Sequence, residues 1–250
     1  MAIKTKTYPP LIPDMKDWPI YKLSEDRDKF IEEIIELTMD RLMRQPKLSD
    51  TIAKTIYLER IRIKEGRWKV DPPNEQLFWK KIRKKLITKS LDKEEKEARI
   101  QNKEILYKIV KRYANEIVGT FKPKTFQFAR KFLTMFFSRL LNTAAGRNFQ
   151  RIYSSRHRLY ERFKVRGYVE EIRSLMKIGT VILVPTHSSN LDSILVGYVM
   201  DAVLGLPSFS YGAGLNLYNT GYTAYFMNRM GAYRIDRRKK NPIYLETLKT

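Results

Sequence analysis

Cysteine is absent from the 250-residue sequence, and histidine occurs only twice, as His157 and His187. The absence of cysteine excludes disulfide bonds, a cysteine nucleophile and cysteine-ligated zinc or iron–sulfur sites. Two histidines are too few for a metal site built from several imidazoles. We therefore expect no metal site, and we expect His157, on a basic helical stretch, to be a surface residue.

Long hydrophobic runs are also scarce. Residues 1–23 lack the continuous apolar stretch of a signal peptide. The longest apolar stretch, 194–215, contains Asp201 and Pro207. The sequence therefore predicts neither a signal peptide nor a transmembrane helix. Its hydrophobic share of 43% is still enough to build a core, which excludes wholesale disorder.

Acidic residues are few relative to basic ones. Lysine and arginine number 49 against 27 aspartates and glutamates, which leaves a formal net charge of +22. Such a charge favours phosphate-bearing ligands, anionic membrane surfaces or nucleic acid as partners. The sequence has no recognised nucleic-acid motif and no evenly spaced aromatic platform, so nucleic acid is the least favoured of the three.

The pattern of apolar residues along the sequence changes near Gly146. Before it, residues 1–22 are rich in proline and aromatics and predict an extended arm, and the remainder follows helical spacing. After it, short apolar runs alternate with helical segments, which is typical of an α/β fold. We therefore expect a helical region over 1–145 and an α/β domain with a mostly parallel or mixed sheet over 146–250.

The expected elements begin or end at recognisable signals. Ser24 is the predicted N-cap of the first long helix, Pro46 ends that helix, and Pro242 suits the first turn of the last one. Helices are expected at 24–45, from 49 through Ile63 and its neighbours, 75–90, 92–118, 123–142, 169–177, 192–204, 217–230 and from 242 onward. Strands are expected at 163–165, 180–185, 207–211 and 231–236, the second of them buried.

The helix predicted over 123–142 is amphipathic. Its apolar stripe includes Ala129, Phe132, Phe136 and Phe137, and its basic residues lie away from the centre of the stripe. Two interpretations stay open. The helix packs on the core, or it lies at a membrane surface with its apolar side in lipid and its basic flanks on anionic headgroups.

A histidine–aspartate pair follows the strand predicted at 180–185. Ligands of α/β sheets commonly bind beyond the carboxyl ends of the strands, where His187 would lie. With His187 in the loop and Asp192 in the first helical turn, the two side chains can meet. Asp192 could then accept the Nδ1 proton and leave Nε2 as a base. The alternative is that Asn190 or Asp192 caps the helix beside an incidental histidine.

Three motifs in order resemble one enzyme family. The segment HSSNLD at 187–192 resembles the first motif, His followed by four residues and Asp, of the acyltransferases of glycerophospholipid synthesis. The preceding Pro-Thr and the segment GAGLNL at 212–217 are similar to the glycerol-3-phosphate acyltransferase branch. GAYRIDR at 231–237 resembles the second motif, although its Ile-Asp-Arg is closer to the lysophosphatidate branch. The family's third motif, Phe-Pro-Glu-Gly, and its fourth are absent, so we expect the first half of that family's domain.

The resemblance implies transfer of a fatty acyl group from acyl-CoA or acyl-carrier protein to a hydroxyl of glycerol-3-phosphate or 1-acyl-glycerol-3-phosphate. His187 would be the general base, oriented by Asp192. The phosphate of the acceptor favours arginine, a planar bidentate donor. The substrate-binding residues would be Arg237, with Arg234 or Arg238 beside it, Ser189 and Gly231.

The resemblance implies no cofactor, because the acyl donor is a substrate. It also implies a peripheral position on the cytoplasmic face of a membrane, where the positive charge would face anionic headgroups. The alternative function is a basic module that binds membrane or nucleic acid without catalysis. For residues 237–240, the alternative is an exposed basic turn.

Overall fold

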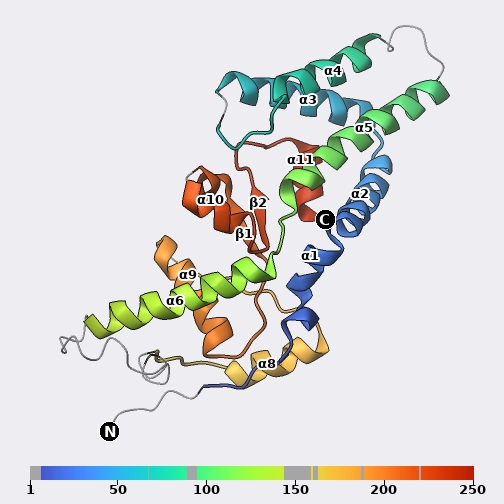
Figure 1. Ribbon diagram of the computed structural model, residues 1–250. Coiled ribbons are helices and arrows are strands. Elements are labelled where there is room, and N and C mark those ends of the chain that lie inside the picture. Colours follow the sequence, from blue (N-terminus) through green and yellow to red (C-terminus); the bar gives the residue numbers. More distant parts are fainter. Residues whose placement is uncertain are drawn as a thin grey trace. The chain divides into compact units, whose positions relative to one another are not determined.

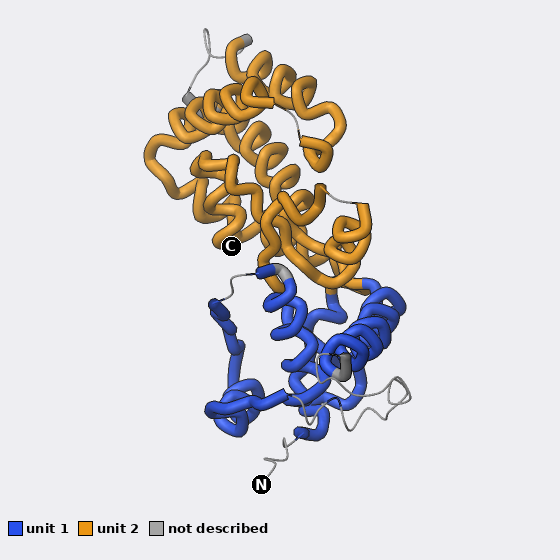
Figure 2. The backbone as a smooth tube through the Cα atoms, turned by 90° about the vertical axis from the view of Figure 1, so that its left-hand side faces the viewer, with its two compact units in different colours: residues 1–22, 122–209 blue, residues 23–121, 210–250 orange. Residues whose placement is uncertain are grey.

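The structure is a computed structural model that describes residues 7–66, 68–88, 95–143, 159, 163–186, 189–219 and 221–250 (Figure 1). The chain forms two compact units, shown in different colours in Figure 2. Unit 1 contains Met1–Lys22 and Lys122–Phe209, and unit 2 contains Leu23–Phe121 and Ser210–Thr250. Each unit therefore combines residues from both sides of position 145. The predicted sequence boundary between a helical and an α/β part stays a prediction.

Unit 2 is built around the long helix α5 (Glu95–Ile117), which packs against α2 (Arg27–Met43), α3 (Leu48–Lys64), α4 (Glu75–Thr88) and α11 (Pro242–Lys249) (Figure 1). Apolar residues recur every three or four positions on each helix and meet in one core. The buried residues of α5 in that core are Ile105, Leu106, Ile109, Val110, Tyr113, Ala114 and Ile117.

The ends of these helices follow local chemistry. Asn241 caps α11 through its side-chain oxygen, which accepts the backbone N–H of Tyr244 at 2.9 Å, and Pro242 stands in the first turn as predicted. Arg27 donates to the carbonyl oxygens of Val118 and Gly119 at 2.9 and 3.1 Å, just beyond α5. The prediction that Ser24 is an N-cap is wrong. Ser24 lies inside the short α1 (Lys22–Glu25), because the chain makes an extra turn before α2.

A small sheet completes unit 2. β1 (Tyr211–Gly214) pairs in parallel with β2 (Ala232–Ile235), with Tyr211 opposite Ala232. The crossover between the strands holds η4 (Leu215–Tyr218) and α10 (Gly221–Met227). The strand predicted at 231–236 is thus confirmed, whereas the one predicted at 207–211 begins only at Tyr211.

Unit 1 contains α6 (Pro123–Thr143), α8 (Val169–Ile178) and α9 (Asn190–Ala202), preceded by the short helical turns η1 (Met15–Asp17) and η2 (Pro19–Tyr21). The proline-rich arm lies on this unit. The backbone N–H of Tyr8 donates to Val203 O at 2.9 Å, and that of Leu11 donates to Gly205 O at 2.7 Å. Gly205 has a φ of 62°, and a Cβ there would lie 2.4 Å from Pro9 O, so the close approach of the arm requires glycine.

Two predicted strands are not found. Residues 163–165 and 180–185 form neither helix nor strand. Ile182 and Val184 are 81% and 87% exposed, so the prediction of a buried strand at 180–185 is wrong. A run of β-branched residues becomes a strand only when a neighbouring strand accepts and donates its backbone hydrogen bonds. The described residues are therefore mostly helical with one two-stranded parallel sheet, which is compatible with a mixed α/β class.

Candidate functional site

Asp192 lies in the first turn of α9, as the spacing predicts. The helix starts with a capping box in which Ser189 is the N-cap. Ser189 Oγ accepts the backbone N–H of Asp192 at 3.2 Å, and Asp192 Oδ2 accepts the backbone N–H of Ser189 at 3.0 Å. The alternative prediction of a cap by Asn190 or Asp192 is therefore wrong about the N-cap residue, although Asp192 takes part in the capping.

His187 and Ser188 lie outside the described residues, and so does His157. The contact between His187 and Asp192 therefore stays a prediction. The described residues on either side, Thr186 and Ser189, are both exposed. The capping box fixes the orientation of the Asp192 carboxylate at the start of α9, next to the segment that carries His187.

The helix that carries Asp192 is anchored to α6 within unit 1. Tyr198 is 4% exposed, and its hydroxyl donates to Thr134 Oγ1 at 3.0 Å. One turn further on, Asp201 Oδ2 accepts from Arg130 Nε at 2.7 Å. Burial raises the pKa of Asp201 to about 6, and the charge of Arg130 only partly opposes this rise.

The raised pKa of Asp201 predicts a pH-dependent contribution to stability. Because the folded state holds this proton more tightly than the unfolded state, the contribution is present at low pH and is lost as the pH rises through about 6. Relative to Asp201→Asn, the wild-type free energy of unfolding should fall by about 1 kcal/mol between pH 5 and pH 7.5. Urea denaturation of both proteins at the two pH values measures this difference. A pH-independent difference would contradict the prediction.

The predicted phosphate-binding residues lie in unit 2, on and beside β2. Arg237 is exposed. Arg234 lies within β2, where its guanidinium donates to Asn228 Oδ1 and stands 5.1 Å from the centre of the Tyr218 ring. Gly231 has a φ of 76°, and its N–H donates to Thr120 O at 2.9 Å, so it forms the turn into the strand.

The two residues after Arg237 are directed toward the interior of unit 2, whereas Lys240 is exposed. The guanidinium of Arg238 donates hydrogen bonds to the carboxylates of Asp236 and Asp71, and it lies 4.1 Å from the centre of the Trp68 ring. Lys239 is 4% exposed and forms an ion pair with Glu116 on α5. The alternative of an exposed basic turn is therefore wrong for these two residues, whose charges are paired inside the protein.

A buried ion network extends from this turn into the helices. Arg62 is 4% exposed and donates to Glu59 Oε2 at 2.7 Å and to Glu75, and Glu75 also accepts from Arg112. Burial by itself would raise the pKa of Glu75, but the positive charges of Lys239, Arg112 and Arg62, together with the hydrogen bond from the Trp79 indole, lower it below its usual value. The network thus ties the turn at 236–241 to α3, α4 and α5.

The sequence prediction missed this network, although a signal for it is present. The buried face of α3 continues as Ile52, Ile56, Glu59 and Arg62, so two charges occupy apolar positions of the helical repeat. A charged side chain on a buried helix face is stable only when an oppositely charged or hydrogen-bonding side chain contacts it.

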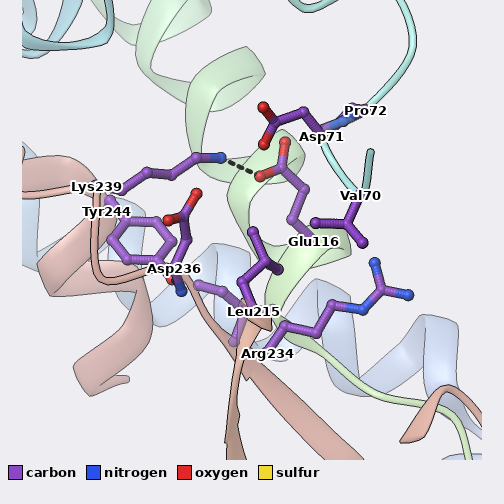
Figure 3. Close-up of a pocket in the computed structure, with 10 residues that line it drawn as sticks. Val70, Asp71, Pro72, Glu116, Leu215, Arg234, Asp236, Lys239 and Tyr244 are labelled. Atoms are coloured by element: carbon purple, nitrogen blue, oxygen red, sulfur yellow. Dashed lines mark hydrogen bonds and ion pairs between the residues drawn. The ribbon is translucent and has the colours of Figure 1, made fainter. Parts of the chain in front are cut away.

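A small cavity of about 30 Å³ lies beside the network (Figure 3). Figure 3 shows Lys239 and Glu116 joined by their ion pair among the lining residues, with Arg234 and Leu215 also contributing. This volume suits about one water molecule and is too small for a phosphorylated glycerol. Within the described part of unit 2, the best phosphate-binding candidate is therefore the exposed Arg237 rather than this interior.

Comparison with known proteins reveals distant relatives. The chain is 27% identical over 164 residues, 65% of its length, to the glycerol-3-phosphate acyltransferase of Pseudomonas aeruginosa strain UCBPP-PA14. The same identity and coverage hold for the glycerol-3-phosphate acyltransferase of Pseudomonas paraeruginosa strain DSM 24068 / PA7. The alignment spans 17% of the length of each relative. No protein-family model matches the chain, and no solved structure does. The similarity suggests a distant acyltransferase relationship.

None of the helices in the described ranges is long and apolar enough to cross a membrane.

Proposed function

We propose that the protein transfers a fatty acyl group from acyl-CoA or acyl-carrier protein to a hydroxyl of glycerol-3-phosphate or 1-acyl-glycerol-3-phosphate. The similarity to enzymes named glycerol-3-phosphate acyltransferase carries this proposal. The ordered motifs at 187–192, 212–217 and 231–237 support the same reaction class.

In the proposed reaction, His187 Nε2 takes the proton of the acceptor hydroxyl as its oxygen attacks the thioester carbonyl carbon. The C–S bond then breaks, and the imidazolium returns the proton to the departing thiolate. Asp192 orients the imidazole and stabilises its charged form. No cofactor and no metal ion take part in these steps.

Arg237 is proposed to bind the phosphate of the acceptor. Its exposure supports this role, because neighbouring Arg238 and Lys239 already have carboxylate partners within unit 2. Arg234 on β2 would assist, and Ser189 and Gly231 would contribute backbone or hydroxyl contacts. We further propose that the protein acts peripherally on the cytoplasmic face of a membrane, and nucleic acid is not a proposed partner.

The test of the proposed activity is an acyl-transfer assay with the full chain, acyl-CoA and either glycerol-3-phosphate or lysophosphatidate. Product formed from glycerol-3-phosphate or lysophosphatidate supports the proposal and identifies the acceptor. Absence of product with both acceptors and with acyl-carrier protein as donor would contradict it. Salt-dependent retardation of nucleic acid in a gel, without acyl transfer, would instead favour a basic binding module.

The phosphate-binding role predicts the kinetics of Arg237→Ala. The KM for the phosphorylated acceptor should rise by about 10- to 100-fold with a much smaller change in kcat, because a charge-assisted contact to the non-reacting phosphate is lost. Lys240→Ala is the matched control, since Lys240 is an exposed basic residue of the same turn. An unchanged KM, or equal changes in both variants, would remove Arg237 from the site.

A further inference from the structure

Helix α6 carries two apolar stripes, and only one of them is needed by the core of unit 1. The buried stripe contains Phe126, Ala129 and Phe137, which are 7%, 6% and 2% exposed. Phe137 packs against Phe163 and Tyr198 with ring centres 6.2 and 5.2 Å apart. Leu133 and Leu141 also pack against the core that contains Phe137, so this side of α6 meets the expectation that the helix packs on the core.

The second stripe faces outward. Its members recur every three or four residues, apart from one adjacent pair, and at about 100° per residue they fall within about 140° of the helix circumference. A continuous row of large apolar side chains with such high exposed fractions is unusual on a protein surface that binds nothing. The exposed stripe consists of Phe128 (60% exposed), Phe132 (47%), Met135 (46%), Phe136 (37%) and Leu140 (43%).

The exposed stripe has a defined shape. The rings of Phe132 and Phe136 are stacked, with centres 6.3 Å apart and planes 16° from parallel. Together with Met135, Arg139 and Leu140, they line a surface hollow of about 370 Å³. Stacked rings one helical turn apart have little side-chain freedom left to lose on binding.

Charge around the exposed stripe has one sign. The sequence of α6 contains Lys124, Arg130, Lys131 and Arg139 and no acidic residue. Arg130 is paired with Asp201, Lys124 and Lys131 are exposed near one edge of the stripe, and Arg139 is exposed between its members. An apolar stripe flanked by basic side chains is complementary to the acyl region and the anionic headgroups of a bilayer.

We propose that the exposed stripe of α6 is the face with which this protein binds an anionic lipid bilayer. The helix would lie in the plane of the interface, with Phe132, Met135 and Phe136 among the acyl chains and Lys124 and Lys131 at the headgroups. The choice of a lipid rather than a protein as the partner rests on the proposed function, because the product of the proposed acyl transfer is a lipid. Binding itself requires no turnover.

The test is flotation of the full chain with vesicles of phosphatidylcholine and phosphatidylglycerol in equal amounts. Phe132→Ser with Phe136→Ser should lower the fraction bound by at least about 10-fold, because two aromatic rings no longer enter the apolar layer. Met135→Ser with Leu140→Ser is the second variant, and it should act in the same direction. The matched control is Leu175→Ser with Ile178→Ser on α8 of the same unit, where the two residues are 54% and 82% exposed.

The charge component is tested separately. Vesicles of phosphatidylcholine alone, or 0.5 M salt, should reduce binding of the wild type, as should Lys124→Glu with Lys131→Glu. Circular dichroism and thermal melting establish that each variant is folded.

Three results would overturn the proposal: no flotation of the wild type, binding by both stripe variants that equals that of the wild type, or a loss in the α8 control as large as in the stripe variants. A wild-type dimer that becomes monomeric in the stripe variants, with vesicle binding unchanged, would assign the face to self-association instead. His187→Ala should float like the wild type. Stripe-dependent flotation without any acyl transfer would therefore reject the proposed function and leave the membrane face intact.

Discussion

His187→Ala should lower kcat for acyl transfer by about 10²- to 10⁴-fold, the range that a general base contributes. The loss should appear in kcat rather than in the KM for either substrate, because the imidazole acts on the proton that moves in the transition state. His157→Ala, which removes the other histidine of the sequence, is the matched control and should retain wild-type turnover. Steady-state kinetics of both variants measure the effect, and full activity of His187→Ala would refute the proposed mechanism.

Asp192→Asn separates catalysis from helix capping. The amide oxygen of Asn can still accept the backbone N–H of Ser189, which Asp192 Oδ2 accepts at 3.0 Å, so the capping box is largely kept. The negative charge that would stabilise the imidazolium is lost. If Asp192 orients His187, this variant should lose turnover with little loss of melting temperature. Parallel losses of turnover and melting temperature would make Asp192 a capping residue only.

Arg62→Met should be among the most destabilising single substitutions in unit 2. Arg62 is 4% exposed and bonds Glu59 and Glu75, which are themselves 1% and 5% exposed. Removing one partner leaves buried carboxylates with less compensation, which costs about 3–5 kcal/mol in comparable buried pairs. The free energy of unfolding from urea denaturation measures this loss.

Arg44→Met provides the comparison for that measurement. Arg44 pairs with Asp40 four residues earlier on the surface, where the side chains are 77% and 57% exposed. Because water screens exposed pairs, this variant should change the free energy of unfolding by no more than about 0.5 kcal/mol. Similar losses in the two variants would mean that the buried network contributes no more than a surface pair.

The helices of unit 2 were predictable because their signals are local. Apolar spacing along α5 and the proline in the first turn of α11 depend on neighbours within a few residues. The prediction of a strand over 180–185 was wrong for the complementary reason. Val181 and Ile182 have the right composition, but a strand also needs a pairing partner, and that partner is remote in the sequence.

In the candidate site, too, local sequence predicted some features and missed others. The residue types and spacing at 187–192 predict a base and an orienting carboxylate, and the family resemblance at 231–237 implies a phosphate-binding arginine; these roles stay predictions. Local spacing also puts Asp192 in a first helical turn, which the structure confirms. Spacing could not reveal that Ser189 is the N-cap, because several polar residues there could serve.

Which of the four consecutive basic residues 237–240 face solvent is a tertiary property. The sequence presents them as equivalent charges, yet Arg238 meets Asp71 and Lys239 meets Glu116, each more than a hundred positions away along the chain. A buried charge is stable only where folding brings an opposite charge to it, and the packing of α3, α4 and α5 decides where that happens. Local sequence thus determined the helices and supplied the candidate functional groups, whereas long-range packing left Arg237 exposed to solvent and turned one stripe of α6 outward.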